Sequence, residues 1–156
     1  SNTDKRINQG KPVTPAFIFA ALLWPAVQRR HLELMAERLP EVPALHQASQ
    51  EIVSRQQQHT AIPKRFGIPM REIWDLQLRL PRRSGKRAQS LFENRRFRAA
   101  YDFLLLREQA GEETGNLGQW WTDYQNQPEN QRDQMARSLR PPTANKRRRP
   151  RKPRPD

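Results

Sequence analysis

The sequence predicts an all-α fold, an irregular bundle of six to eight helices followed by a disordered Arg/Pro-rich C-terminal tail. Apolar residues recur at helical spacing in most segments, and prolines or glycines separate one segment from the next. No stretch alternates apolar and polar residues for long enough to indicate a β-sheet. The sequence contains no internal repeat, which argues against a helical solenoid.

The first helix is predicted to begin at Thr14 and Pro15. Threonine is a suitable N-cap, and proline suits the first helical position, where its missing N–H costs nothing. An apolar run then extends to Trp24, and Pro25 should kink or restart the helix. A second helical stretch over residues 26–38 ends before Pro40. The polar residues 1–13 are interpreted as a lead-in to this helix.

Two further helices are predicted in the middle of the chain. Residues 44–59 follow Pro43 and place one set of apolar residues on a common face: Leu45, Ala48, Ile52 and Val53. Residues 62–69 form a connector, because a residue before proline is pushed away from helical backbone angles. Pro69 starts the next helix. Its inner face is expected to consist of Met70, Ile73, Trp74, Leu76 and Leu80.

The rest of the chain predicts shorter helices. Residues 81–85 interrupt the previous helix, residues 86–93 form a short one, and Asn94 caps a longer one that ends at Gly111. The inward residues of that longer helix are expected to be Phe97, Ala100, Tyr101 and Leu104. A loop follows over residues 111–118, then helices over 119–127 and 128–139. Adjacent helix positions cannot both face inward, so one residue of the Trp120-Trp121 pair should pack and the other should be partly exposed.

Length and composition indicate one compact body at residues 1–139 and a tail at residues 140–156. The absence of cysteine excludes a disulfide framework and a thiolate zinc site, and it fits a reducing compartment.

The longest apolar stretch has nine residues, whereas a membrane span needs about twenty. A secretory signal is also rejected, because Pro25 and two arginines follow that stretch. We therefore expect a cytoplasmic protein without an integral membrane span, and the start at Ser1 suggests a piece of a longer chain.

The tail has the strongest charge bias. Residues 140–156 contain eight Lys or Arg, one acid and five prolines, without a large apolar side chain. Because proline removes N–H donors and like charges repel, this segment should stay extended and bind a polyanion, either nucleic acid or an acidic membrane surface. Its candidate nucleic-acid-binding residues are Lys146, Arg147, Arg148, Arg149, Arg151, Lys152 and Arg154.

The sequence shows no catalytic constellation. His31, His46 and His59 have no partner at metal-ligand spacing, so each is interpreted as a surface or core residue. Residues 84–86 resemble the end of a P-loop, but the upstream glycine and the preceding strand are missing. No D-x-D pair offers carboxylates for magnesium-assisted phosphoryl transfer. We predict no catalytic residue and no metal site.

A second basic cluster lies between residues 79 and 98, where eight Lys or Arg accompany a single acid. Most of these cations have no acid at a suitable sequence spacing. Three arginines would fall in the first turn of the Asn94 helix, where the helix dipole disfavours each cation by about 0.3–1 kcal/mol. Free backbone N–H groups there would attract a phosphate of a nucleic-acid strand. The candidate binding residues are Arg82, Arg83, Lys86, Arg87, Arg95, Arg96 and Arg98.

A purely structural role is the alternative for some of these cations. Arg98 can pair with Asp102 four residues on, and Arg71 and Arg79 can flank Asp75 at the same spacing. Aromatic side chains can in principle stack on bases. Three of them lie on inward faces and should pack in the core instead: Trp74, Phe97 and Tyr101.

Several segments are distinctive enough to compare with known families. They are REIWDLQLRL at residues 71–80, RRSGKR at 82–87 and FRAAYDFLLLR at 97–107, supported by PAFIFAALLW at 15–24, IPKR at 62–65, the tryptophan pair and the Arg/Pro-rich end. Together they resemble the C-terminal half of the bacterial poly(A) polymerases, over roughly residues 3–156. That family belongs to the class of nucleotidyltransferases shared with tRNA CCA-adding enzymes.

The resemblance implies a parent enzyme that adds adenylates from ATP to RNA 3′ ends and marks RNA for decay. Its Mg²⁺ is held by carboxylates of an upstream head. Neither the G-S segment nor the D-x-D pair of that head occurs here, so no catalytic residue is carried over. We expect no cofactor in this chain, with ATP and Mg²⁺ serving the parent through its head. The chain would be the helical body and tail that hold RNA, inactive alone.

The implied partners are single-stranded RNA 3′ ends and proteins of RNA decay, and we expect a monomer. One alternative is the matching half of a CCA-adding enzyme, although an enzyme that recognises one folded tRNA has less use for a promiscuous basic arm. Another is a non-enzymatic basic protein that binds RNA or DNA. A membrane-surface protein ranks last, because no Lys-rich amphipathic helix with a bulky apolar face is present.

Overall fold

The computed structural model describes residues 14–59 and 62–139, and within them it contains α-helices, one 3-10 helix and no strand. The elements are α2 (Pro15–Ala36), α3 (Glu41–His59), η1 (Lys64–Phe66), α4 (Gly67–Arg79), α5 (Lys86–Phe92), α6 (Phe97–Gln109), α7 (Leu117–Gln125) and α8 (Glu129–Ser138). The predicted all-α fold is confirmed. The predicted lead-in and basic tail lie outside the described residues, and the division into body and tail stays a prediction.

Helix α2 begins as predicted but does not restart at Pro25. The Oγ1 atom of Thr14 accepts a hydrogen bond from the backbone N–H of Phe17 at 3.3 Å, and Pro15 occupies the first helical position. The helix then continues through Pro25 to Ala36. Pro25 is exposed, whereas Trp24 and Val27 beside it are buried. Packing of the buried face therefore holds the helix together across the proline, which sequence reasoning alone treats as a break.

Two other helices begin earlier than predicted. Helix α3 starts at Glu41 and α4 starts at Gly67, so Pro43 and Pro69 lie inside the first turn instead of preceding it. The first-turn N–H groups of a helix have no intrahelical acceptor, so proline is tolerated there. These prolines mark the first turn of a helix and not its first residue.

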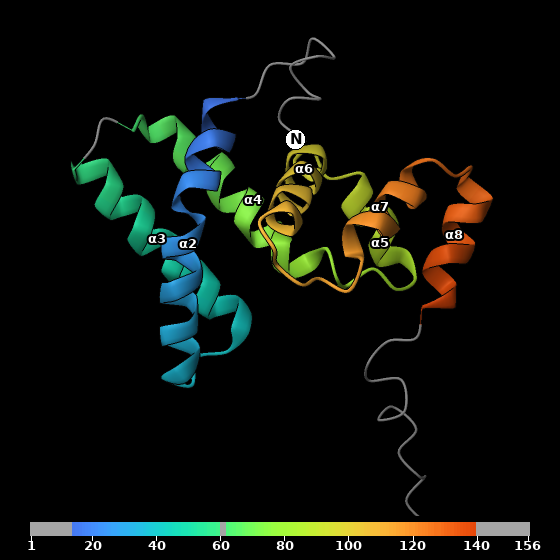
Figure 1. The fold of residues 1–156 in the computed structure, drawn as a ribbon, viewed down its shortest axis with the longest axis horizontal. Coiled ribbons are helices and arrows are strands. Elements are labelled where there is room, and N and C mark those ends of the chain that lie inside the picture. The colour runs from blue at the N-terminus through green and yellow to red at the C-terminus, as the bar shows by residue number, and fades with distance from the viewer. Residues whose placement is uncertain (1–13, 60–61, 140–156) are drawn as a thin grey trace, which may run out of the picture.

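The buried side chains form two apolar clusters. Figure 1 shows α2 and α3 on one side of the molecule, α5, α7 and α8 on the other, and α4 and α6 between them. The first cluster joins α2, α3 and the start of α4, and the second joins the end of α4 to α5, α6, α7 and α8. Helix α6 contributes Phe103 to the first cluster and Leu104 to the second. All the inward residues predicted for α3, α4 and α6 are buried.

Two buried tryptophans tie these helices together through their indole N–H groups. Trp74 donates to the backbone carbonyl of Ala20 at 3.1 Å, which joins α4 to α2. Trp121 donates to the carbonyl of Leu80 at 3.0 Å, which joins α7 to the end of α4. A buried indole N–H without an acceptor would be costly, so these contacts also fix which carbonyl each ring faces.

A connected set of polar side chains crosses from α4 through α6 to α2. Gln77 is buried, and its amide nitrogen donates to the carbonyls of Ile73 at 3.0 Å and Ala100 at 3.2 Å. Arg107 donates to the amide oxygen of Gln77 at 2.9 Å and forms an ion pair with Glu112 at 3.1 Å. Glu112 in turn accepts hydrogen bonds from α2.

Glu112 is the point at which α2 is attached to the loop after α6. Its carboxylate accepts from the indole N–H of Trp24 and from the amide of Gln28, each at 3.0 Å. Burial by itself would raise the pKa of Glu112, but the hydrogen bonds from Arg107 and Trp24 favour the ionised form, and the pKa is lowered. The ionised carboxylate therefore stabilises the fold at neutral pH.

Replacing Glu112 by Gln should destabilise the protein in a pH-dependent way. A lowered folded pKa gives stability above the unfolded pKa of about 4.3, and this stability is lost as the pH falls through the folded pKa. Glu112→Gln should lower the free energy of unfolding at pH 7 by about 1–3 kcal/mol, and the difference from the parent chain should disappear in acid. Urea unfolding across this pH range measures both. Glu113→Gln, at the exposed neighbouring position, is the control, and an equal acid response of all three proteins would contradict the assignment.

Candidate nucleic-acid interface

The structure divides the predicted basic cluster of residues 82–98 into two groups. The α4–α5 group lies in the turn between these helices and in the first turn of α5, and it consists of Arg82, Arg83, Lys86 and Arg87. The α5–α6 group lies in the turn before α6 and at its start, and it consists of Arg95, Arg96 and Arg98. The two groups differ in how many of their charges are already paired.

The α5–α6 group is largely occupied by acids. Arg95 and Arg96 both form ion pairs with Glu72 of α4, at 3.3 Å and 2.9 Å. Sequence spacing offers no acid to either arginine, and the structure supplies one. The reason is tertiary, since Glu72 lies 23 and 24 residues before them and no local spacing reveals the contact.

The helix on which the predicted phosphate site depends does not begin at Asn94. Asn94 does not cap this helix, because its side-chain oxygen accepts from the backbone N–H of Arg96 at 2.8 Å and α6 begins only at Phe97. Arg95 and Arg96 thus precede the helix. Arg98 lies in its first turn, where its Nε is 3.7 Å from a carboxylate oxygen of buried Asp102, as the structural alternative predicts.

Other polar residues have structural partners as well. Arg79 lies 4.0 Å from Asp75 at the expected spacing, and His46 contacts the same carboxylate at 2.7 Å. The ring of His31 is buried and lies 2.9 Å from the carbonyl of Glu41.

Within residues 14–59 and 62–139, no group of three or more His, Cys, Asp or Glu side chains could hold a metal ion. No helix in these ranges is long and apolar enough to cross a membrane.

The α4–α5 group keeps more of its charge available. Arg82 forms an exposed ion pair with Glu41 at 3.2 Å, an acid that sequence spacing could not identify. Lys86 and Arg87 are exposed, and their side chains have no hydrogen bond or ion pair with another residue that the structure describes. An exposed ion pair contributes little to stability, so three of these cations can bind an external anion at small cost.

Arg83 differs from its neighbours because it lies on an aromatic ring. Its guanidinium carbon is 4.7 Å from the ring centroid of Trp120, a cation–π contact. Burial lowers the pKa of Arg83, and its Nε atom is buried without a hydrogen-bond partner among the described residues. The structure thus contains a partly desolvated guanidinium with unused donor capacity beside the exposed charges of Lys86 and Arg87.

The aromatic rings near Arg83 belong to α7 and α5, and Arg132 of α8 lies over two of them. Trp121 is fully buried and Trp120 is half-buried, so the prediction for this pair is confirmed. The rings of Trp120 and Tyr124 are stacked, with centroids 5.2 Å apart and planes at 20°. Arg132 of α8 lies 5.8 Å from the Tyr124 ring and 5.0 Å from the Phe92 ring. Sequence reasoning missed Arg132, because the rings that it covers belong to α5 and α7.

The exposed cations of the α4–α5 group suit the charged backbone of single-stranded nucleic acid. The half-buried ring of Trp120 is the aromatic side chain there that a base could meet, because Tyr124 is only 1% exposed. The α4–α5 group, with Trp120, Tyr124 and Arg132 next to it, is therefore the candidate interface. The candidate tail residues, from Lys146 to Arg154, lie outside the described residues.

Comparisons of this chain with a family model and with individual proteins identify the same family. The family model described as polymerase A arginine-rich C-terminus matches residues 37–155. Poly(A) polymerase I of Salmonella typhi is 39% identical over 153 residues, which cover 96% of this chain and 33% of the relative. Poly(A) polymerase I of Escherichia coli O157:H7 is 38% identical over 156 residues, covering 97% and 34%. The Haemophilus influenzae protein of the same name is 34% identical over 138 residues, covering 86% and 30%. The chain thus spans about a third of the length of these relatives.

The ion pairs of Glu72 predict that the α5–α6 group stabilises the fold. In the double variant Arg95→Glu with Arg96→Glu, three acids would face one another, and the free energy of unfolding should fall by about 1–2 kcal/mol. Adding Glu72→Arg reverses every sign and should restore most of this loss. Thermal melting of the three proteins measures the effect, and an unchanged melting temperature in the double variant would show that the arginines are not structural.

Proposed function

Because this chain belongs to the polymerase A arginine-rich C-terminus family, we propose that it is the RNA-holding C-terminal region of a poly(A) polymerase. The parent enzyme adds adenylates from ATP to RNA 3′ ends and so promotes RNA decay. The similarity of nearly the whole chain to proteins named poly(A) polymerase I supports this proposal. It also favours a poly(A) polymerase over the CCA-adding alternative.

The observation that carries the RNA-holding role is the α4–α5 group. Lys86 and Arg87 are exposed and unpaired within the described ranges, and Arg83 covers Trp120 beside them. Phosphates pair with such cations without regard to base sequence, and aromatic faces accept any base. A tailing enzyme must accept many different RNA ends, so a surface without base-specific contacts suits it. The polybasic residues 140–156 would add affinity and reach.

We assign the chemistry to the part of the parent protein that this chain does not match. The described residues do not fit a Mg²⁺ site, because no cluster of acids that could hold the ion occurs among them. Mg²⁺ would be held by carboxylates elsewhere in the parent, where ATP would also bind, and this chain would guide the RNA strand toward that site. We further propose that the protein acts in the cytoplasm as a monomer, with proteins of RNA decay as additional partners.

The salt dependence of RNA binding tests how the phosphate contacts are divided between residues 140–156 and the α4–α5 group. Each phosphate neutralised on a single strand contributes about −0.7 to the slope of log affinity against log salt. Deleting residues 140–156 should therefore remove most of a slope near −4 to −6, and Lys86→Gln with Arg87→Gln should remove about 1.4 from the remainder. Fluorescence anisotropy with an oligoadenylate gives both values. If neither change alters the slope, the proposed binding of RNA by these two parts of the chain is wrong.

The proposal that this chain binds RNA while the rest of the parent performs catalysis gives a second expectation. Incubated with ATP, Mg²⁺ and an RNA primer, this chain should bind the primer but not extend it, because the residues that the structure describes include no group that could hold the metal. Gel analysis of a labelled primer measures extension, and a longer poly(A) polymerase that includes the remaining two thirds is the positive control. Extension by this chain alone would refute the assignment of catalysis to the rest of the parent.

A further inference from the structure

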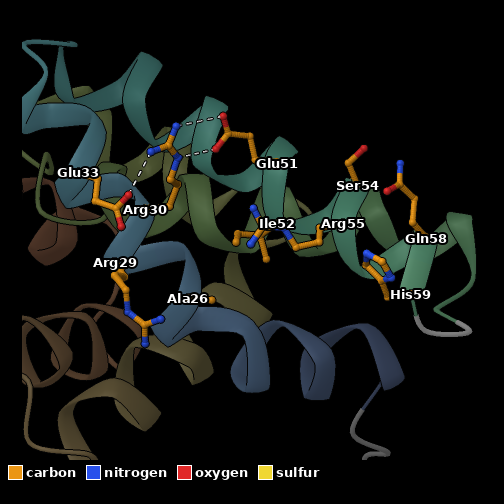
Figure 2. Close-up of a pocket in the computed structure, with 10 residues that line it drawn as sticks. All are labelled: Ala26, Arg29, Arg30, Glu33, Glu51, Ile52, Ser54, Arg55, Gln58 and His59. Carbon is orange, nitrogen blue, oxygen red and sulfur yellow. Dashed lines mark hydrogen bonds and ion pairs between the residues drawn. The ribbon is translucent and has the colours of Figure 1, made fainter.

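A groove of about 610 Å³ lies between α2 and α3. Its α3 lining lies between residues 51 and 59, away from Glu41, the α3 residue that pairs with Arg82 of the α4–α5 group. Its lining includes the apolar side chains of Ala26 and Ile52, and arginines contributed by both helices (Figure 2). The volume is in the range of sites for small organic ligands. We call this feature the α2–α3 groove.

Arg30 organises the charges of the α2–α3 groove. It donates from Nε to Glu51 at 2.6 Å, from Nη2 to the second oxygen of the same carboxylate at 3.4 Å, and from Nη1 to Glu33 at 3.1 Å. Figure 2 shows Arg30 held between the two acids. The hydrogen bond from Arg30 is the main reason that the pKa of Glu51 is lowered. Both acids are therefore engaged with one cation.

This arrangement removes the natural partners of two other arginines. Glu33 lies four residues after Arg29 on α2, and Glu51 lies four residues before Arg55 on α3. That spacing normally produces an ion pair along one helix. Here Arg30 binds Glu33 on its own helix and Glu51 across the groove instead. Arg29 and Arg55 are exposed, and neither has an ion pair or side-chain hydrogen bond with another described residue, although the charge of Arg55 also helps to lower the pKa of Glu51.

The result is a groove with an unpaired guanidinium on each wall. Its charged lining counts three arginines against two glutamates, so the net charge is only +1 with histidine neutral. The positive field is therefore concentrated at Arg29 and Arg55, while Arg30 and its acids form a neutralised end. Ser54 and Gln58 line the same α3 wall and can hydrogen-bond to oxygen atoms.

We propose that the α2–α3 groove binds the backbone phosphates of the RNA strand through Arg29 and Arg55, with Arg30 as a positioning residue that keeps both of them free. The inference rests on the proposed function and adds a second contact point to it. A guanidinium fork matches two phosphate oxygens. The apolar floor suits a sugar or base face.

The position of the groove defines its role. Helices α2 and α3 lie at one end of the molecule and α5, α7 and α8 at the other, with α4 and α6 between them. A strand held in the groove and at the α4–α5 group would cross the whole body. Two separated contacts set the direction of the strand, which one contact cannot do. The groove thus orients RNA as well as adding affinity.

The test compares two double variants with the same loss of charge. Arg29→Gln with Arg55→Gln removes the groove arginines. Arg71→Gln with Arg137→Gln removes two exposed arginines outside the groove, each of which only approaches a backbone carbonyl four residues earlier at 3.4 Å. Binding of a fluorescein-labelled oligoadenylate is measured by anisotropy at several salt concentrations. The groove variant should lose at least about tenfold in affinity and about 1.4 in salt slope, and the control should lose much less.

The positioning role of Arg30 gives an independent readout. Arg30→Gln should free Glu33 and Glu51 to pair with Arg29 and Arg55, so RNA affinity should fall by an amount close to that of the groove variant. Adding Glu33→Gln and Glu51→Gln should then restore it. This experiment leaves both binding arginines in place, so it remains decisive if the groove double variant melts at a lower temperature.

The outcomes separate the two proposals. If the groove variant behaves like its matched control while deletion of residues 140–156 still reduces the slope, the groove inference is overturned and the proposed function stands. If the unchanged chain does not bind oligoadenylate, both are overturned. Loss of affinity in the groove variant together with recovery in the Arg30, Glu33 and Glu51 triple variant would establish the groove as an RNA site.

Discussion

The placement of α2 against α4 and α6 depends on directional hydrogen bonds. One joins Trp74 to the carbonyl of Ala20, and a connected set begins at buried Gln77. Its amide bonds to the carbonyl of Ala100 and to Arg107, and Arg107 bonds to Glu112. Glu112 then holds Trp24 and Gln28 of α2. Apolar contacts are non-directional and would allow α2 to slide, whereas each of these groups has a defined donor or acceptor direction. The set fixes the register in which the two apolar clusters meet, and with it the distance between the two proposed RNA contacts.

Competition for acids decides which of the many arginines remain available to a ligand. Glu72 neutralises Arg95 and Arg96, and Glu41 pairs with Arg82. Arg30 has the opposite effect, because it takes two acids and leaves two other arginines unpaired. A high positive charge therefore does not identify a binding site by itself. The pairing pattern in three dimensions does so, since an arginine already bound to a carboxylate must give up that bond before it can bind a phosphate.

The two proposed contacts have different chemistry. At the α4–α5 group the cations lie beside the half-buried ring of Trp120, which could meet a base as the cations meet phosphates. The α2–α3 groove has arginines and apolar side chains without Phe, Tyr or Trp in its lining, which suits the backbone. A strand that crosses both would be held without base-specific hydrogen bonds. That property agrees with the proposed role of holding RNA ends of many sequences.

The sequence by itself determined the all-α class, the buried faces of α3, α4 and α6, and the unequal burial of Trp120 and Trp121, because helical periodicity is a local property. It also identified the family through segments such as residues 71–80. Local spacing could not show that Glu72 reaches Arg96, that α2 passes through Pro25, or that Glu51 forms its ion pair with Arg30 and not with Arg55. Those facts are set by which helices pack together, because contacts across helices override both proline signals and the ion pairs expected four residues apart within one helix.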